Sequence, residues 1–295
     1  MNKIGKKALE KLEFFIYVLP IIIFIFFAFY IPFGMNIYYS MTQWNGIQRN
    51  PVFVGLKNYI QILQGDADFM NSSIFTVKYG ILYIIIINVL ALVLAVLLVK
   101  NLKTKNLLRA GFFIPYILSL VIVGFIWKFI FSMGFDSLSQ MTGFGIFKLS
   151  WLGVPNLAFF SVLFVSVWQS VGFYSVIYIA GLQSIPQDIM EAAVVDGVGP
   201  VRKFFSITLP MLMPSVTTCV FLALTNSIKV FDVILSLTGG GPGGTTSSVT
   251  FNIYREAFQY NNYGYGTAES MILFVAVIVI TLLQVSYFKG KEVEV

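Results

Sequence analysis

Six long apolar segments, separated by more polar connections, constrain this sequence more than any other feature. A membrane-spanning helix needs about 20 predominantly apolar residues. The second segment reads YGILYIIIINVLALVLAVLLV and is apolar on every side, whereas a helix on a soluble core keeps one polar face. The sequence therefore predicts an all-α integral membrane protein with six transmembrane helices, at about residues 14–33, 79–99, 110–131, 157–182, 210–235 and 270–288.

The composition of the 295 residues supports this prediction and excludes several classes of protein. Only 11% of the residues are charged, whereas a soluble domain carries about 25% charged residues. The sequence contains no histidine, which excludes a Ser-His-Asp triad and the commonest zinc and copper sites. Its single cysteine, Cys219, cannot form a disulfide within the chain.

The first segment has two interpretations. A basic stretch precedes it, as in a secretory signal peptide, whose apolar part is about 7–15 residues long and ends at a small-residue cleavage site. Here the apolar run is longer and continues into the sequence YIPFGMNIYYSMTQWNG. The pattern therefore favours a retained span over a cleaved signal.

The distribution of Lys and Arg predicts how the chain crosses the membrane, because basic residues are enriched in cytoplasmic connections. With the N-terminus inside, twelve basic residues are cytoplasmic and five are outside. Residues 1–13 and 289–295 then form cytoplasmic ends. The net charge of +6 reflects this asymmetry and attraction to anionic lipid, and it does not argue for nucleic-acid binding. The cytoplasmic set is Lys3, Lys6, Lys7, Lys11, Lys100, Lys103, Lys105, Arg109, Arg202, Lys203, Lys289 and Lys291, and the outer set is Arg49, Lys57, Lys78, Lys148 and Arg255.

The cytoplasmic connection at residues 183–209 is too polar to cross a membrane, and its pattern predicts a short helix. Pro186 fits a helix start, and Asp188 and Glu191 place carboxylates near the N-terminus, where the helix dipole favours them. Gly197 is expected to end the helix. On pattern alone, this element is either an interfacial loop helix or a helix that docks into a groove of a partner protein.

A motif of fixed spacing in this connection favours the second interpretation. Glu191-Ala192-Ala193 is followed after three residues by Gly197 and after nine more by Ile207-Thr208-Leu209-Pro210. This resembles, at every position, the EAA signature of binding-protein-dependent ABC importer permeases. The stretch KVFDVI, followed by TGGGP, resembles the end of the fifth span in carbohydrate importers of the maltose and glycerol-phosphate type. Weaker matches occur in the family's order from about residue 14 to the C-terminus.

The resemblance implies a type I ABC importer fold and a set of partners. The chain would pair with a homologous second permease subunit, as a heterodimer, and with two ATPase subunits that bind ATP and Mg²⁺. No G-x-x-x-x-G-K-[ST] motif occurs here, so we expect no nucleotide site and no cofactor in this chain. An extracytoplasmic solute-binding protein would deliver a sugar or oligosaccharide to this multi-pass permease in the cell (inner) membrane. The residues implied in ATPase coupling are Asp188, Glu191, Ala192, Ala193, Asp196, Gly197, Ile207, Leu209 and Pro210.

Polar residues inside spans are costly and are therefore candidates for the translocation path. In the fifth segment, Asn226, Lys229 and Asp232 recur every three residues and would lie on one flank of a helix. They could bind sugar hydroxyls. Alternatively, Lys229 and Asp232 could pair with each other and extend to the outer interface.

Aromatic side chains are further candidates, because the apolar faces of sugar rings stack on aromatic rings. Trp168, with Gln169, lies near the middle of a predicted span, and Trp127 lies near the outer end of another. Phe173 and Phe231 complete the set. The alternative is packing against lipid or the protein core, since the chain contains 30 Phe.

A run of glycines follows the fifth segment on the predicted outer side. The sequence GGGPGG would lose much conformational entropy in regular structure, so it is expected to form a flexible cap. In the related permeases this loop lies near the mouth of the pore. The resemblance therefore implies docking of the solute-binding protein at Gly239, Gly240, Gly241 and Pro242.

Two other classes of function are weighed against this prediction. An ion-gradient-driven secondary transporter would bury several acidic residues in its spans or use interrupted helices, whereas the acidic residues here lie mostly at span ends and in loops. An intramembrane enzyme without histidine would need paired carboxylates in its spans, and the sequence offers no such pair. We therefore predict a transport subunit that is not an enzyme. Which sugar it carries stays open.

Overall fold

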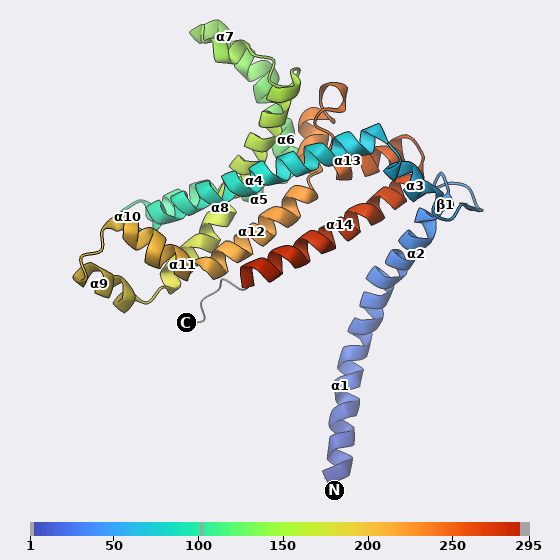
Figure 1. Cartoon of the computed structure of the whole chain (residues 1–295), viewed down its shortest axis with the longest axis horizontal. Coiled ribbons are helices and arrows are strands. Elements are labelled where there is room, and N and C mark those ends of the chain that lie inside the picture. Colours follow the sequence, from blue (N-terminus) through green and yellow to red (C-terminus); the bar gives the residue numbers. More distant parts are fainter. Residues whose placement is uncertain (1–2, 101–102, 290–295) are drawn as a thin grey trace. The chain divides into compact units, whose positions relative to one another are not determined.

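The computed structural model describes residues 3–100 and 103–289, with side chains at 13–100 and 103–287. This part of the chain is mostly helical, which confirms the predicted all-α class (Figure 1). The residues pack as two compact units, each built from segments that are far apart in the sequence. Unit 1 contains Met1–Gln64 and Ile253–Ile272, and unit 2 contains Gly65–Asn252 and Leu273–Val295. The region predicted as one permease domain, 14–288, thus contains two packing units.

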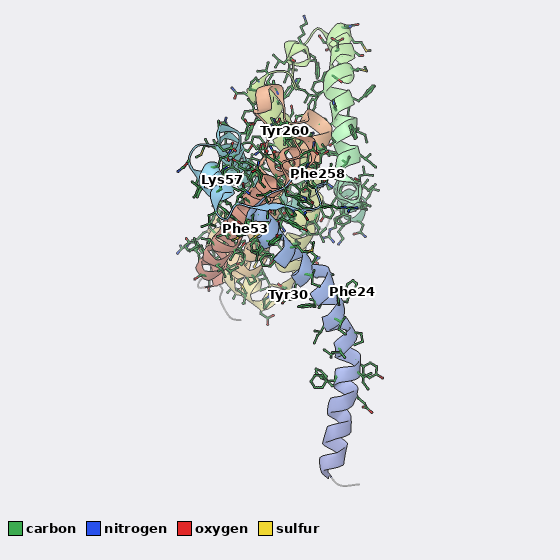
Figure 2. The ribbon with its side chains drawn as sticks, turned by 90° about the vertical axis from the view of Figure 1, so that its right-hand side faces the viewer. Phe24, Tyr30, Phe53, Lys57, Phe258 and Tyr260 are labelled. Atoms are coloured by element: carbon green, nitrogen blue, oxygen red, sulfur yellow. The ribbon has the colours of Figure 1, made fainter. Side chains whose placement is uncertain are left out.

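Unit 1 begins with a continuous helix whose apolar side chains are exposed. Helix α1 (Lys3–Ile25) continues through a π-helical turn, η1 (Phe26–Tyr30), into α2 (Ile31–Ser40). The most apolar stretch of this helix has no buried residue, and Figure 2 shows the side chains of Phe24 and Tyr30 beside the ribbon. An apolar surface of this extent requires lipid or another protein chain around it.

The end of α2 is fixed by a small hairpin and a short helix. Strand β1 (Thr42–Gln43) pairs antiparallel with β2 (Val52–Phe53), and α3 (Lys57–Leu63) follows. Asn58 on α3 donates from Nδ2 to the carbonyl oxygens of Ser40 and Thr42, both at 2.9 Å. Helix α3 therefore holds the chain at the point where α2 ends.

Two segments near the C-terminus complete unit 1. They are the π-helical turn η7 (Arg255–Gln259), which follows α13 (Val249–Tyr254), and the first part of α14 (Tyr263–Lys289). The amide of Gly264 donates to the carbonyl oxygen of Trp44 at 3.0 Å. A Cβ atom at Gly264 would lie 2.0 Å from the carbonyl oxygen of Thr42, so this close approach requires glycine.

The core of unit 2 is formed by three packed helices: α4 (Ala67–Val99), α8 (Pro155–Ser184) and α12 (Met213–Ile228). Polar side chains form hydrogen bonds between them. The Tyr178 hydroxyl donates to Asn88 Oδ1 at 2.6 Å, and Asn226 Nδ2 donates to the Tyr174 hydroxyl at 3.2 Å. Within a membrane, such bonds help to determine which helix faces meet.

The third predicted span, 110–131, is wrong as a continuous helix. Helix α5 (Lys105–Ile117) is separated from α6 (Leu120–Phe129) by a break at Leu118 and Ser119. The break follows Pro115, which cannot donate the backbone hydrogen bond of a regular helix. Helix α6 then continues through η2 (Ile130–Gly134) into α7 (Phe135–Thr142), and the short helix η3 (Gly145–Lys148) follows.

The fifth predicted span, 210–235, is also interrupted. The segment formed by α10 (Pro200–Lys203), η4 (Phe204–Thr208) and α11 (Leu209–Met211) is bent by 70° relative to α12, with the break at Leu212. Helix α12 ends at Ile228, and η5 (Ile234–Thr238) follows a non-helical stretch. The break lies just after the Leu209-Pro210 motif and just before Pro214, and neither proline can donate a backbone hydrogen bond.

The described residues contain five helices that are long and apolar enough to cross a membrane, or six if the bent pair counts as one span. This agrees with the predicted number of spans but shifts several of their limits. The five helices cover Glu13–Ser40, Ala67–Val99, Leu120–Thr142, Pro155–Ser184 and Tyr263–Tyr287, and the bent pair covers Pro200–Met211 and Met213–Ile228.

Candidate functional site

The EAA motif begins on a separate short helix, α9 (Gln187–Val195), which lies with α10 and α11 at one end of unit 2 (Figure 1). The predicted stop at Gly197 is confirmed, since Gly197 has a φ of +68°. Its amide donates to the carbonyl oxygen of Val194 at 3.1 Å, and the Val198 amide donates to that of Ala193 at 3.0 Å. These two bonds form a Schellman motif, in which glycine is favoured at this position.

Helix α9 exposes one part of the motif and buries another. Glu191 and Ala192 are exposed, whereas Ala193 is only 3% exposed and packs against its own chain. The two alanines therefore do not share one contact face. Asp188 and Asp196 are exposed.

Two side-chain hydrogen bonds involve α9, one within the helix and one from α10. Gln187 Nε2 donates to Glu191 Oε1 at 2.6 Å, one turn along the helix. From α10, Lys203 donates through Nζ to the carbonyl oxygen of Met190 at 3.0 Å. The motif residues Ile207, Leu209 and Pro210 are half-buried and lie in the segment just before the bend. A continuous series of contacts thus connects α9 to the start of α12.

Trp127 and Trp168 lie together on one side of unit 2, with ring centroids 5.4 Å apart. Both line a cavity of about 790 Å³ whose lining residues are all apolar, including Phe131 and Phe164. Apart from the indole N–H groups of its tryptophans, none of the described side chains that line the cavity can hydrogen-bond to a sugar hydroxyl. This geometry favours a packing role for Trp127 and Trp168 over stacking on a sugar ring.

Gln169, predicted as a substrate contact, instead stabilises the break between α5 and α6. Its Nε2 donates to the carbonyl oxygens of Tyr116 at 3.3 Å and Leu118 at 3.4 Å, and its Oε1 accepts from Ser170 at 3.0 Å. The residue is only 6% exposed. Phe173, one turn along α8, stacks on Tyr116 with centroids 4.4 Å apart. The structure therefore assigns Gln169 to helix packing.

Asn226, Lys229 and Asp232 do not lie on one helix, because α12 ends at Ile228. Within the described part of the chain, no ion pair joins Lys229 to Asp232, and both side chains are exposed. Asn226 is exposed as well, and Phe231 is half-buried with its ring 6.1 Å from that of Phe251. Asn226 donates to the Tyr174 hydroxyl at 3.2 Å, whereas Lys229 and Asp232 present exposed charged groups.

The end of α12 depends on two residues that the sequence analysis did not identify. Ser248 donates from Oγ to the carbonyl oxygen of Val230 at 2.6 Å, and Thr250 donates from Oγ1 to that of Ile228 at 3.3 Å. These hydroxyls satisfy carbonyls that a continuing helix would have bonded. The cluster of Ser and Thr after the glycine run was a signal for such a role.

The glycine run is folded, so the expected flexible cap is wrong. Gly240 is buried, with a φ of +97°, and its carbonyl oxygen accepts from the Thr246 amide at 2.8 Å. The hydroxyls of Thr238 and Thr246 are 2.9 Å apart and hydrogen-bonded. A short 3₁₀ turn, η6 (Pro242–Gly244), completes the loop. Gly239 is exposed, while Gly241 and Pro242 are half-buried.

The described residues contain no group of three or more His, Cys, Asp or Glu side chains that could hold a metal ion. The site is therefore composed of an exposed short helix, a bent connection to α12, and exposed polar groups in the last turn of that helix and just beyond it.

Comparisons with known proteins relate the chain to transport permeases. It is 40% identical over 294 residues to the "Probable starch degradation products transport system permease protein AmyD" of Thermoanaerobacterium thermosulfurigenes, with full coverage of both chains. It is 37% identical to the multiple sugar-binding transport system permease protein MsmF of Streptococcus mutans, covering 94% of each chain.

A solved structure supports the fold. A bacterial ABC transporter involved in the import of the acidic polysaccharide alginate contains a chain that superposes with a TM-score of 0.83 at 21% identity, covering 98% of this chain and 99% of that one. In addition, residues 87–289 match the model of the family described as binding-protein-dependent transport system inner membrane component. The protein belongs to this family of ABC transporter permeases and has their type I transmembrane fold.

Proposed function

We propose that this chain is a pore-forming subunit of an ATP-driven importer that carries a sugar or oligosaccharide. The observation that carries the proposal is the EAA connection, in which α9 exposes Glu191 and is followed by the bent segment that leads into α12. The permeases of starch degradation products and of multiple sugars, at 40% and 37% identity, support a carbohydrate as the substrate.

The proposed partners follow the organisation of the family. They are a homologous second permease subunit, two ATPase subunits that bind ATP and Mg²⁺, and an extracytoplasmic solute-binding protein. A structure of the related alginate transporter in complex with an alginate pentasaccharide-bound periplasmic protein supports the last of these. The folded glycine loop, with Gly239 exposed, is the proposed docking region.

The proposed orientation places both termini in the cytoplasm and the chain in the cell membrane. The excess of basic residues at 1–13, 100–109 and 202–203 supports it. Lys291 belongs to the predicted cytoplasmic set but lies outside the described residues. In this orientation α9 is cytoplasmic, on the side where ATP is available.

The proposed coupling uses the contacts around α9. Glu191 and Ala192 would meet the ATPase, and Lys203 would transmit the displacement of α9 to α10. Because α10 to α11 is bent by 70° relative to α12, a movement of this segment would change the orientation of α12. Asn226 in the last turn of α12, and Lys229 and Asp232 beyond the end of that helix, are the proposed polar contacts for sugar hydroxyls, with Phe231 beside them.

Two substitutions test this proposal in the assembled transporter. Glu191→Lys reverses an exposed charge, and Gly197→Pro introduces a residue whose φ of about −65° is incompatible with the observed +68°. Both are expected to abolish sugar uptake and the stimulation of ATPase activity by the loaded binding protein. Asp136→Lys, a matched charge reversal at an exposed acid on α7, is the control. Uptake and coupled hydrolysis that survive both substitutions would contradict the proposal.

A further inference from the structure

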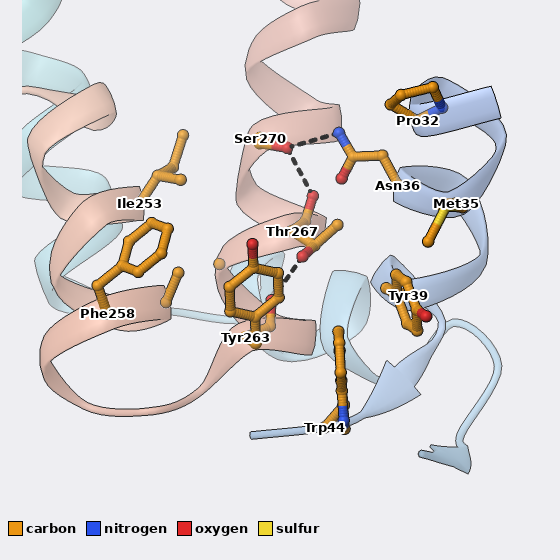
Figure 3. A pocket seen from close by; sticks show the side chains of 12 residues that line it. Pro32, Met35, Asn36, Tyr39, Trp44, Ile253, Phe258, Tyr263, Thr267 and Ser270 are labelled. Atoms are coloured by element: carbon orange, nitrogen blue, oxygen red, sulfur yellow. Dashed lines mark hydrogen bonds between the residues drawn. The ribbon is translucent and has the colours of Figure 1, made fainter. Parts of the chain in front are cut away.

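A pocket in unit 1 is lined by residues that do not include any of the substrate-path candidates. Its volume is about 430 Å³, and it is lined by α2, Trp44 just after β1, Ile253 of α13, η7 and the first turns of α14 (Figure 3). None of the described residues that line it is charged. A concave site of this size, with aromatic walls and a few polar groups, is typical of a small-molecule site.

Aromatic rings form the walls of this pocket. Tyr263 lies between Phe258 and Trp44 in Figure 3 and meets both edge to face, with centroids 5.6 Å and 5.3 Å apart. Trp44 in turn stacks on Tyr39 at 4.2 Å. Phe258 is 62% exposed, so an apolar ring face is available to a ligand.

Contacts outside the pocket hold these rings in position. The indole nitrogen of Trp44 donates to the carbonyl oxygen of Gln48 at 2.8 Å. A Cβ atom at Gly46, which has a φ of +82°, would lie 3.2 Å from the Tyr263 ring. Gly264 bonds to Trp44 through the backbone. The walls are therefore pre-organised, which lowers the entropic cost of binding.

Polar groups with remaining hydrogen-bonding capacity line the same pocket. Asn36 Nδ2 donates to Ser270 Oγ at 3.4 Å, which leaves its second amide hydrogen and Oδ1 without a partner in the described part of the chain. The hydroxyl of Tyr263 likewise forms no hydrogen bond within the described part of the chain. Ser270 donates to the carbonyl oxygen of Thr267 at 2.9 Å and can still accept a bond.

We propose that this pocket binds a neutral glycosyl ring. The absence of charged lining residues disfavours an anion or a cation, while exposed ring faces combined with an amide and hydroxyls match the C–H face and hydroxyls of a pyranose. In the orientation given under the proposed function, on which this inference rests, the end of α2 and the start of α14 lie on the extracytoplasmic side. The ring could come from a free oligosaccharide or from a glycolipid headgroup in the outer leaflet.

The test uses the whole transporter in lipid nanodiscs, labelled with 5-fluorotryptophan and studied by ¹⁹F NMR without ATP or binding protein. The resonance that disappears in Trp44→Phe reports on the pocket, and the one that disappears in Trp151→Phe serves as the control. Two probes are used separately: maltotriose in phosphatidylglycerol discs, and monoglucosyl diacylglycerol incorporated into the discs. If Trp44→Phe does not fold, variants at the other tryptophans identify the resonance by elimination.

The Trp44 resonance is expected to shift saturably with at least one probe, and the Trp151 resonance is expected to stay unchanged. Asn36→Leu and Tyr263→Phe should each weaken binding by about tenfold, since each removes hydrogen-bonding groups. A trisaccharide of glucuronic acid should cause no shift, because no cation lines the pocket. A shift with maltotriose indicates a soluble source, and one with the glycolipid alone indicates a lipid source.

The inference is overturned if neither probe shifts the Trp44 resonance, or if the shifts persist unchanged in both Asn36→Leu and Tyr263→Phe. The outcome is separate from that of the proposed function. Glu191→Lys should abolish uptake while leaving the pocket signal intact, whereas pocket variants should leave basal ATPase activity unchanged. If the Trp44 resonance does not respond while Glu191→Lys abolishes uptake, the pocket proposal has failed. If the resonance responds while Glu191→Lys leaves uptake intact, the proposed function has failed.

Discussion

Gly172 lies at a close approach of α8 to α5, and it provides a test of this packing at a single residue. A Cβ atom at this position would lie 1.9 Å from the backbone carbonyl oxygen of Phe112. Gly172→Ala is therefore expected to force the two helices apart and to cost about 1–3 kcal/mol of stability. Gly111→Ala, on the facing helix, has no atom within 4 Å of the new Cβ and is the matched control.

For this pair we would measure the apparent melting temperature of the detergent-solubilised protein. It is obtained by size-exclusion chromatography of samples heated to a series of temperatures. Gly172→Ala should melt clearly below the wild type, while Gly111→Ala should melt at or above it, because alanine is a better helix former. Equal melting temperatures for the two variants would show that α5 and α8 do not pack as described.

Gln169 offers a second residue-scale prediction, because a structural role and a substrate contact differ in their kinetic effects. Gln169→Leu leaves the carbonyl oxygens of Tyr116 and Leu118 without their amide donor, at a cost of about 1–3 kcal/mol. We expect a lower melting temperature and an unchanged half-saturating sugar concentration for uptake. Gln140→Leu, at an exposed position on α7, is the control. A raised half-saturating concentration at normal stability would restore the substrate role.

At the scale of elements, the interruption after α12 depends on hydroxyl groups from a later segment. Ser248→Ala removes the donor to the carbonyl oxygen of Val230 and is expected to cost about 1–2 kcal/mol locally. Hydrogen exchange measured by mass spectrometry should then accelerate across 228–238. Thr218→Val, which removes an exposed hydroxyl bonded only within α12, should leave exchange there unchanged. Unchanged exchange in Ser248→Ala would mean that the hydroxyl does not stabilise the break.

Hydropathy predicted where the apolar helices lie but not where they are interrupted. An apolar run is a local property, so the C-terminal ends of α4 and α8 were predicted to within a few residues. An interruption depends on partners remote in sequence: Gln169 is 51 residues from Leu118, and Thr250 is 22 from Ile228. A single sequence does not show that such residues meet, so 110–131 and 210–235 were predicted as continuous.

At the scale of the whole molecule, sites formed by one short segment were also predictable, whereas a site formed by remote segments was not. The EAA loop was predicted in detail because its residues lie within one short segment and its turn depends on one glycine, Gly197. The pocket of unit 1 was not predicted, because Tyr39 and Tyr263 come from opposite ends of the chain. Only the packing of its aromatic residues shows that they enclose a common space.

The orientation of the whole molecule can be tested with single cysteines, because the one native thiol does not interfere. Cys219 is fully buried, and Cys219→Ala provides a background without it. Ile47, 80% exposed between β1 and β2, is predicted to lie outside, and Val195, 86% exposed at the end of α9, is predicted to be cytoplasmic. In intact cells, a membrane-impermeant maleimide should label Ile47→Cys and spare Val195→Cys. Permeabilised cells should give labelling at both positions, which controls for reactivity. The reverse pattern in intact cells would invert the topology and place α9 out of reach of any cytoplasmic ATPase, so this measurement also tests the premise on which the coupling proposal depends.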